Sequence, residues 1–501
     1  MMTRNSAPQL IDKAVIDVGS NSVRLVIFRT NATFFQPIFN EKVSASLGRG
    51  VMDTRLLNPK GVSATRTAMV RFMKIIKARG ISSVYAVATA AVRDAEDGTD
   101  FLAKIEAETG LQVKMLSGAE EARLSALGVI AGEPTANGLM ADLGGSSLEL
   151  VRLADGKPGV GITHKLGPLA MGIDRRFDLK TIKKEATRIL ENSFEFDQEN
   201  PPKTLYAVGG AWRSLALVHI ELKGYPLHIL HNYRLSYREA KVLTKLVERQ
   251  SPDSLTKVLG ISARRAATLP YAALLLGRLL KLTKVREVVI SSFGLREGLL
   301  YDDLPPEQAS RHPVLASVEA LAHQNWSSPE FGRAVEEWLA PVFDHIKPVF
   351  GKTRTKLLQT AVCQLADIGA RMHPDHRAEI AFDLVLFAPF AGLTHAERTA
   401  LALVVFHRCA GPVVPPRISL LMRLVDEDIR SWATTIGLGL RCASAVSGRT
   451  KILLEQTRLS IKDDVLTLDA HDEQSALLTT TPGRRLQDLA DAMSLQSQLT
   501  G

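Results

Sequence analysis

The sequence predicts two α/β units followed by a mainly helical region. A turn rich in glycine and serine occurs twice, each time after a hydrophobic strand that ends in aspartate. Short apolar strands alternate with amphipathic helices up to about residue 303, which is typical of mixed sheets covered by helices. From Pro305 onward a 3.6-residue apolar repeat dominates. We therefore expect domains at residues 1–135, 136–304 and 305–501.

The first unit is expected to open with a meander of strands at residues 14–17, 23–29 and 33–39. Residues 59–78 carry apolar side chains at helical spacing and predict an amphipathic helix. The expected order then continues with a strand at 84–88, a helix at 100–108, a strand at 111–116 and a helix at 119–130.

The second unit repeats this strand order from Gly138. We expect a hairpin over 138–153, a returning strand at 205–208, a helix at 212–220 and a late strand at 287–290. Helices are expected further on at 313–324, 328–346, 356–372, 378–390 and 394–406, with strand-like pieces at 451–454 and 465–468. The polar tail beyond Gln474 is expected to be loosely held.

The repeated turn has the composition of a phosphate-binding loop. The copies are Asp17-Val18-Gly19-Ser20-Asn21-Ser22 and Asp142-Leu143-Gly144-Gly145-Ser146-Ser147. Glycine lets backbone N–H groups approach an oxyanion, and the side chains of Ser20, Asn21, Ser22, Ser146 and Ser147 add polar groups. Asp-x-Gly turns are also common in ordinary hairpins. Their duplication favours a cleft that holds a phosphate chain between two turns.

The aspartates at the strand ends suit a divalent metal. Asp142 and Glu149 lie seven residues apart on opposite limbs of the second hairpin, so both can approach one Mg²⁺ ion. Mg²⁺ usually takes one or two carboxylates and keeps several waters. Asp17 is expected to act as an outer ligand from the other unit.

Composition narrows the class of protein. The 501 residues are 46% hydrophobic and 23% charged, enough for about three domains at roughly 150 residues each. No apolar run approaches the ~20 residues of a membrane span. Residues 1–13 lack the apolar core of a secretion signal. Cys363, Cys409 and Cys442 are too scattered for a disulfide framework or a zinc site, so we expect a cytoplasmic protein with reduced thiols.

The net charge of +9 is unevenly distributed along the chain. Residues 201–300 hold most of the basic excess, which predicts a positive surface that attracts a polyanion. Solvated helix faces are the alternative for any single lysine. Aromatic residues make up only 6% of the chain and no nucleic-acid motif accompanies the charge, so nucleic acid is not the expected partner.

The chain resembles the exopolyphosphatase and guanosine pentaphosphate phosphohydrolase (Ppx/GppA) family, within the superfamily of actin and sugar kinases. Five segments carry the resemblance in order: the two turns, Ala88-Thr89-Ala90-Ala91-Val92-Arg93-Asp94, Leu116-Ser117-Gly118-Ala119-Glu120-Glu121-Ala122-Arg123 and Ser292-Phe293-Gly294-Leu295-Arg296-Glu297-Gly298. The resemblance implies two actin-like (ribonuclease H-like) domains with an active-site cleft between them. It also implies a helical C-terminal domain related to HD phosphohydrolases but without their metal ligands, and a homodimer.

The resemblance also implies catalytic roles. Glu121, at the start of a helix, is the expected base that activates water, with Glu120 as the alternative and a further metal ligand. Arg93 follows a small-residue turn and suits donation to phosphate oxygens. Gly209 and Gly210 resemble the late glycine turn that binds nucleotide in sugar kinases. Mg²⁺ is the implied cofactor, and K⁺ dependence stays open.

The main hypothesis is processive, Mg²⁺-dependent release of orthophosphate from the end of inorganic polyphosphate. Removal of the terminal phosphate of guanosine pentaphosphate (pppGpp) is the first alternative. An actin-like ATPase or sugar kinase and a non-catalytic polyphosphate sensor are the others.

Three local features qualify these expectations. Ser146 stands where the family has a third glycine, which puts substrate choice in question. His373-Pro374-Asp375-His376 has a metal-binding appearance, but Pro374 interrupts the helix. Ala366-Asp367 has alanine where the family resemblance leads to a histidine. We therefore expect the helical domain to be structural, as part of a channel or a dimer interface.

Overall fold

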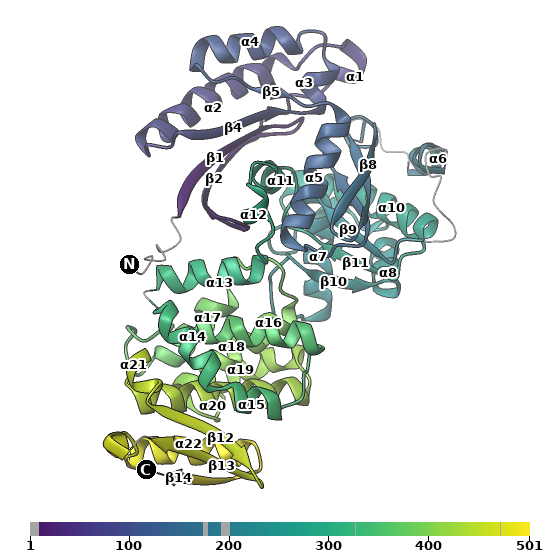
Figure 1. Cartoon of the computed structure of the whole chain (residues 1–501). Helices are drawn as coiled ribbons and strands as arrows, with labels where there is room; N and C mark the ends of the chain where they lie inside the picture. The colour runs from purple at the N-terminus through teal and green to yellow at the C-terminus, as the bar shows by residue number, and fades with distance from the viewer. Residues whose placement is uncertain (1–9, 174–178, 192–200, 326, 471, 501) are drawn as a thin grey trace. The chain divides into compact units, whose positions relative to one another are not determined.

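A computed structural model describes residues 10–173, 179–191, 201–325, 327–470 and 472–500 (Figure 1). The described chain forms two compact units, one spanning Leu10–Pro313 and one from Val314 onward. The expectation for residues 1–13 falls mostly on residues 1–9, which lie outside the described residues. No helix of the described chain combines the length and apolar character needed to cross a membrane.

The first sheet of the α/β unit has the strand order β3-β2-β1-β4-β5. The first three strands form an antiparallel meander, and β4 and β5 continue the sheet in parallel to β1. This part contains β1 (Ile11–Val18), β2 (Val23–Asn31), β3 (Phe34–Val43), α1 (Val51–Thr54), α2 (Pro59–Ala78), β4 (Ser83–Ala88), α3 (Ala90–Asp94), α4 (Gly98–Thr109) and β5 (Lys114–Met115). The bounds of α2 match the prediction, whereas β5 is shorter than expected.

The second sheet repeats the pattern with the order β10-β11-β9-β6-β7-β8. A meander of β6, β7 and β8 is again followed by a strand parallel to its first member, here β9. The elements are α5 (Gly118–Gly132), β6 (Gly138–Leu143), β7 (Leu148–Ala154), β8 (Lys157–His164), α6 (Leu179–Glu191), β9 (Thr204–Val208), α7 (Gly210–Lys223), β10 (Tyr233–Ser236), α8 (Tyr237–Val247), α9 (Pro252–Leu255), α10 (Ala263–Thr283), β11 (Glu287–Ile290), α11 (Leu295–Asp302) and α12 (Pro306–Ala309). The expected repetition of strand order is confirmed.

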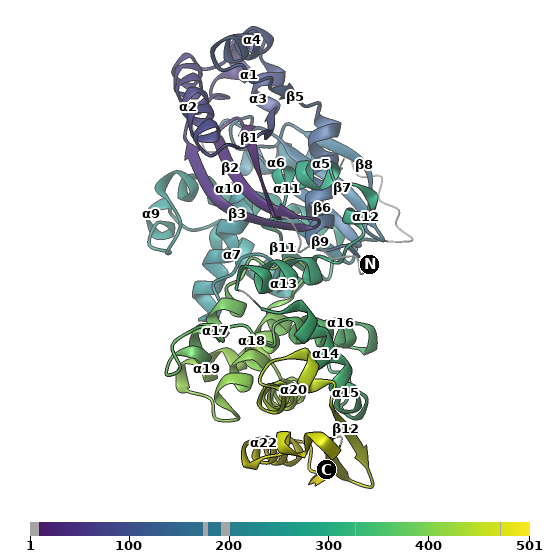
Figure 2. The same cartoon turned by 60° about the vertical axis from the view of Figure 1, so that its left-hand side comes forward.

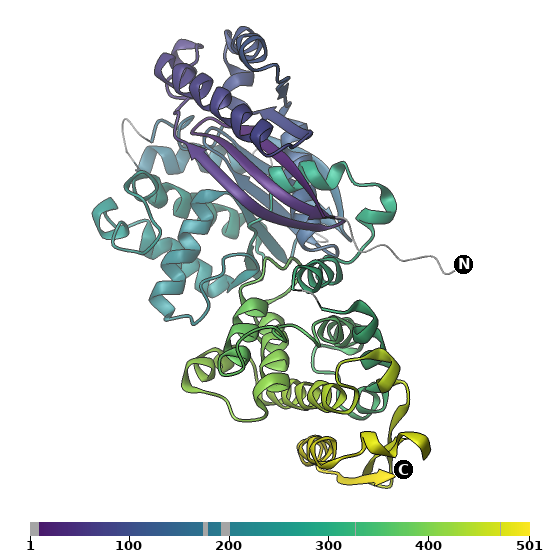
Figure 3. The same cartoon turned by 90° about the vertical axis from the view of Figure 1, so that its left-hand side faces the viewer.

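Helices cover both sheets of the α/β unit. Alternate residues of β1 face opposite sides, so Ile16 packs towards α2 and α4 while Val15 packs towards α5 and α11. Figure 3 shows α2 lying along one face of the first sheet. The second sheet lies between α5 on one face and α7, α8 and α10 on the other.

Two glycines let α5 and α11 approach closely. A Cβ atom on Gly128 would lie 2.1 Å from the carbonyl oxygen of Gly294, and one on Gly298 would lie 1.8 Å from that of Leu124. Any side chain at either position would push the helices apart, because backbone atoms cannot yield as a flexible side chain can. This contact fixes α5, whose first turn carries Glu121.

The helical unit ends in a small sheet of order β12-β13-β14, with α22 packed beside it (Figure 2). Its elements are α13 (Pro313–Gln324), α14 (Pro329–Trp338), α15 (Ala340–His345), α16 (Lys352–Gln364), α17 (Arg377–Leu386), α18 (His395–Ala410), α19 (Pro416–Leu421), the 3₁₀ helix η1 (Met422–Leu424), α20 (Glu427–Ser447), α21 (Lys451–Leu454), β12 (Thr457–Lys462), β13 (Val465–Ala470), the 3₁₀ helix η2 (Asp472–Leu477), α22 (Thr480–Ala492) and β14 (Gln496–Thr500).

Several expectations for the helical unit were wrong. The strand expected at residues 451–454 is helix α21, because a short apolar run fits either structure and here only Leu454 is buried. The tail is ordered: α22 buries Leu486 and Leu489, and β14 pairs in parallel with β13. The single helix expected over 328–346 is divided at Leu339, two residues before Pro341.

Candidate active site

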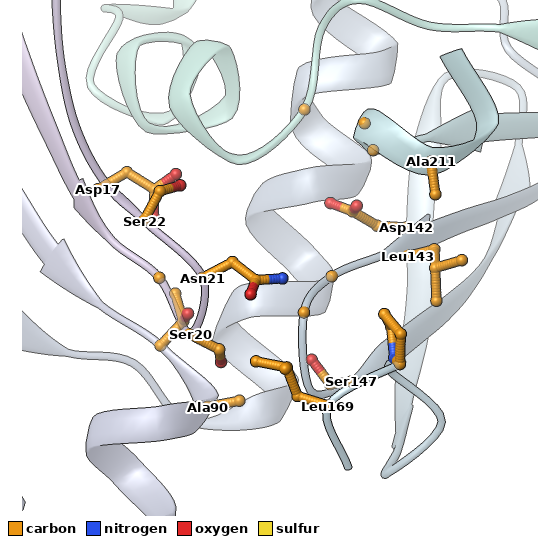
Figure 4. A pocket seen from close by; sticks show the side chains of 18 of the residues that line it. Asp17, Ser20, Asn21, Ser22, Ala90, Asp142, Leu143, Ser147, Leu169 and Ala211 are labelled. Atoms are coloured by element: carbon orange, nitrogen blue, oxygen red, sulfur yellow. The ribbon is translucent and has the colours of Figure 1, made fainter. Parts of the chain in front are cut away.

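The repeated turns lie across a pocket of about 790 Å³ in the α/β unit. Figure 4 shows Asp17, Ser20, Asn21 and Ser22 from the first turn opposite Asp142 and Ser147 from the second. The start of α7 closes the pocket with the glycines that follow β9. The predicted site residues that line it are Asp17, Ser20, Asn21, Ser22, Glu121, Asp142, Gly144, Gly145, Ser147, Glu149, Gly209 and Gly210.

The two turns share the same internal hydrogen bond. The Gly19 N–H donates to the Ser22 carbonyl at 3.1 Å, and the Gly144 N–H donates to the Ser147 carbonyl at 2.9 Å. The turns also meet each other: a Cβ atom on Gly145 would lie 2.9 Å from Asn21 Nδ2. Any side chain at position 145 would therefore have to displace the Asn21 side chain.

Ser146 was expected to bind phosphate, but it does not line the pocket. Its hydroxyl points towards Gly48, where Ser146 Oγ lies 3.4 Å from the position of a Cβ atom. Its backbone packs against Gly167. The Ser146 side chain therefore lies beside Gly48, whose other near neighbours are Ser20 and Ala91.

Glu121, the predicted base, lines the pocket from the first turn of α5. Ser117 caps α5, and Glu121 follows in the first turn with only 8% of its surface exposed. Burial raises the pKa of Glu121 to about 7; the Arg93 guanidinium opposes the shift, and Asp142 and Asp17 add to it. A carboxyl group with this pKa can accept a proton near neutral pH.

Arg93 contacts Glu121 rather than the open pocket. Arg93 Nη1 donates to Glu121 Oε2 and to the Leu116 carbonyl, both at 3.0 Å. Arg93 Nε also lies 3.6 Å from Asp94 Oδ1, so Arg93 forms a second ion pair beside the one with Glu121. In this arrangement Arg93 orients the Glu121 carboxylate, and direct donation to phosphate stays a prediction.

Glu120 lies outside the pocket. Its Oε2 accepts hydrogen bonds from the Ser117 N–H and hydroxyl at 3.0 Å, and its Oε1 lies 2.9 Å from Lys114 Nζ. The ion pair with Lys114 and the bonds from Ser117 lower the pKa of Glu120 to about 2. Adjacent helix residues point about 100° apart, so the turn that directs Glu121 inward directs Glu120 to the surface. The structure therefore corrects the expectation that Glu120 reaches the metal.

Asp142 and Glu149 face each other across β6 and β7. Burial raises the pKa of both, and that of Glu149 is raised further by Glu121 and Asp142. Asp142 Oδ2 accepts a hydrogen bond from the Ser125 hydroxyl at 2.8 Å, whereas Glu149 Oε1 is buried without a hydrogen-bond partner. Buried carboxylates that repel one another fit a divalent cation, which would relieve the repulsion.

The described residues contain no group of three or more histidine, cysteine or acidic side chains placed to hold a metal. The pair Asp142 and Glu149 matches the one or two carboxylates that Mg²⁺ commonly uses. Asp17 lines the same pocket from the first turn, and burial raises its pKa as well.

A set of basic side chains lines the remainder of the pocket: Arg24, Lys42, Arg49, Arg213, Arg264, Arg265 and Arg296. Burial, together with neighbouring arginines, lowers the pKa of Arg24 and of Arg213 to about 10 and that of Lys42 to about 8. Arg264 Nη2 donates to Asn21 Oδ1 at 2.6 Å. The segment 201–300 thus delivers four of these cations to the pocket, as its charge suggested.

The sequence reasoning missed Arg24 and Lys42. Arg24 pairs with Asp17 across β1 and β2, and with Lys42 across β2 and β3. The seven-residue spacing across the hairpin that pairs Asp142 with Glu149 would also have indicated Arg24 opposite Asp17. Predicting the position of Lys42 required the pairing register of β2 and β3. That register shifts at a bulge between Ile27 and Phe28 of β2.

The buried carboxylates predict a stability that falls as pH rises. Because the folded pKa of Glu121 and Glu149 exceeds the ordinary value, their contribution is fully present below about pH 4.3 and is lost as pH rises through the folded pKa, about 7 for Glu121. Without divalent metal at pH 8, Glu149→Gln should therefore raise the Tm by roughly 2 °C or more.

The matched control is Glu120→Gln, because the pKa of Glu120 is shifted in the opposite direction. Thermal unfolding at pH 5 and pH 8 should show a gain for Glu149→Gln only at the higher pH and none for Glu120→Gln at either. A Tm for Glu149→Gln at or below that of the wild type at pH 8 would mean that the buried charge is already compensated by the protein.

Comparison with known proteins gives the same family for both units. The family model "Ppx/GppA phosphatase family" matches residues 26–307, and "Exopolyphosphatase, C-terminal" matches residues 314–499. Exopolyphosphatase 1 of Mycobacterium tuberculosis is 26% identical over 308 residues, 58% of this chain and 88% of the relative. Retrograde regulation protein 2 of Saccharomyces cerevisiae is 25% identical over 426 residues, 75% of this chain and 72% of the relative.

A solved structure agrees with these matches. The crystal structure of a Ppx/GppA family member from Aquifex aeolicus is 26% identical, with a TM-score of 0.51 over 58% of this chain and 97% of its own. The mixed sheets and the pocket between their turns agree with the actin-like fold that the resemblance implied, and the helical region agrees with the expected C-terminal domain. The chain belongs to the Ppx/GppA phosphatase family.

Proposed function

We propose that the protein is an exopolyphosphatase that releases orthophosphate from the end of inorganic polyphosphate with the help of Mg²⁺. One observation carries the proposal: Glu121 shares its pocket with several cations that form no close ion pair with a carboxylate. Within the described residues, no ion pair is formed by Arg24, Lys42, Arg213, Arg265 or Arg296. Basic groups left unpaired in a half-buried pocket favour an anionic ligand of high charge.

The proposed reaction is hydrolysis of the terminal phosphoanhydride bond. A water molecule attacks the terminal phosphorus in line with the leaving oxygen, and Glu121 accepts the proton of that water. The bond to the leaving oxygen breaks, which yields orthophosphate and a chain shorter by one phosphate. Arg93 holds Glu121 in place, while backbone N–H groups of the two turns and the pocket arginines stabilise the charge on the phosphate oxygens.

Asp142 and Glu149 would hold the Mg²⁺ ion, with Asp17 near it from the first turn. The ion supplies positive charge to the phosphate oxygens near the bond that breaks. Without a cation the two carboxylates repel each other, and this repulsion favours binding of the ion.

The lining of the pocket favours polyphosphate over a nucleotide. Among the described residues that line it, none is aromatic. A base commonly gains roughly 1–3 kcal/mol from stacking on an aromatic side chain. The glycine turn at Gly209 and Gly210, where a sugar kinase would bind nucleotide, instead has Arg265 beside it and Arg213 one turn into α7. Guanosine pentaphosphate is the second candidate because its phosphates could use the same cations.

A phosphate-release assay on long-chain polyphosphate, guanosine pentaphosphate and ATP, with and without Mg²⁺, tests the proposal. We expect Mg²⁺-dependent release from polyphosphate, with kcat/KM at least about tenfold above that for guanosine pentaphosphate and little release from ATP. Preferential cleavage of guanosine pentaphosphate would replace this function with the alarmone phosphatase. Binding of polyphosphate without release would favour a sensor, and release from ATP alone would favour an ATPase.

A further inference from the structure

Not all of the basic segment 201–300 reaches the pocket. Three of its cations, Lys203, Arg234 and Arg286, line a second hollow of about 500 Å³ in the α/β unit. It lies at the amino ends of β9 and β11, whose carboxyl ends lead into the pocket at Gly209 and Ser291. The two hollows are therefore at opposite ends of the same strands.

Lys203 and Arg286 are neighbours that immediately precede the adjacent parallel strands β9 and β11. The register pairs Thr204 with Glu287, so Lys203 and Arg286 precede the first pair of the ladder. The Arg286 N–H donates to the Lys203 carbonyl at 2.6 Å, which ties the two backbones together. Neighbouring strands lie about 4.8 Å apart, and like charges at such positions repel. Both side chains are exposed, and within the described residues neither forms an ion pair.

Among the described residues that line this hollow, Glu287 is the one carboxylate. Arg234 Nη1 lies 3.0 Å and 3.1 Å from the two carboxylate oxygens of Glu287, and the Thr204 hydroxyl donates to Glu287 Oε1 at 3.0 Å. Glu287 thus neutralises Arg234, and no other carboxylate among the described residues that line the hollow compensates the charges of Lys203 and Arg286. A bound anion would remove their repulsion, so the hollow has the chemistry of a phosphate site.

We propose that this hollow is a second binding site for inorganic polyphosphate, which holds a distant part of a long chain while the chain end lies in the active-site pocket. The proposal rests on the proposed function. With four to five residues per strand, the two hollows are separated by roughly 13–17 Å along the strands. A short substrate occupies one of them. A long chain reaches both, and the second contact raises its effective concentration at the first.

The test compares two double variants that each remove two positive charges. Lys203→Gln/Arg286→Gln removes the two positive charges of the hollow that form no described ion pair. Lys74→Gln/Lys104→Gln is the control, since both lysines are exposed on helices of the same unit and line neither hollow. At low salt the first variant should raise KM for long polyphosphate roughly tenfold and leave tripolyphosphate unchanged. Its slope of log KM against log salt should fall by about 1.5, because two positive charges are removed, while the control behaves like wild type.

Equilibrium dialysis of long polyphosphate without divalent metal separates this proposal from the proposed function. Weaker binding by Lys203→Gln/Arg286→Gln than by the control supports the second site even if the enzyme hydrolyses another substrate. Equal losses in both variants would show a general effect of net charge and overturn the proposal. Single-stranded RNA that competes as well as polyphosphate of equal charge would also overturn it, because the hollow would then serve any polyanion.

Discussion

Replacing Glu121 with glutamine should lower kcat for polyphosphate by roughly 10² to 10⁴, the usual range for loss of a general base. Glutamine keeps the shape of the side chain and can still contact Arg93, but it cannot take a proton from water. Polyphosphate binding should therefore be retained. Single-turnover phosphate release measures the chemical step directly, and equilibrium dialysis without metal measures the binding.

Glu120→Gln is the control, because it changes the same chemical group one residue away. Glutamine also fits the capping box at this position, so α5 should keep its first turn. Its kcat should stay within about twofold of wild type, since Glu120 faces solvent and Lys114. A wild-type rate for Glu121→Gln, or a large loss for Glu120→Gln, would remove Glu121 from the role of base.

The pH dependence of kcat/KM provides a second test of Glu121 as the base. Because Glu121 has a pKa of about 7 and must be ionised to accept a proton, kcat/KM should fall as pH is lowered through that region. Glu121→Gln should lose this acidic limb.

Local sequence rules predicted those parts of the fold in which neighbouring residues decide the structure. Helix α2 begins at Pro59, after the side chain of Asn58 accepts a hydrogen bond from the Lys60 N–H, and its bounds match the apolar period. The two turns were recognisable because glycine and aspartate recur in the same order. Their approach across one pocket followed from the duplicated strand pattern.

The remaining features depend on contacts between distant segments. The tail was expected to be loose because it is polar. In the structure Leu486 and Leu489 are buried, and β14 pairs with β13. Ser146 looks like a phosphate ligand in the sequence, but the turn directs its side chain to Gly48, which follows β3. Lys42 enters the pocket only through the register of β3. None of these placements is encoded in nearby residues.

Asp142→Asn and Glu149→Gln should each raise the Mg²⁺ concentration that gives half-maximal activity by roughly tenfold or more. The reason is that each removes one of the two charges that face each other across β6 and β7. Losses of 10–100-fold in metal affinity are typical even for residues that only support a ligand. Mg²⁺ titrations of phosphate release measure the shift.

The effect of Mg²⁺ binding on Tm tests the same prediction independently of catalysis. Mg²⁺ that binds the folded protein alone raises Tm with its concentration, and a weaker site needs more metal for the same rise. Both variants should therefore gain less Tm from Mg²⁺ than wild type, although Glu149→Gln starts from a higher Tm without metal at pH 8.

Asp375→Asn is the control from the helical unit, where Asp375 is exposed and lies 3.8 Å from His373 Nδ1. Its Mg²⁺ requirement and its Tm response should match wild type. Unchanged titrations for Asp142→Asn and Glu149→Gln together with a changed one for Asp375→Asn would place the working metal in the helical unit. Because the described acidic residues of the pocket repel one another and those around His373 are solvated, the pocket is where a cation relieves the greater electrostatic cost.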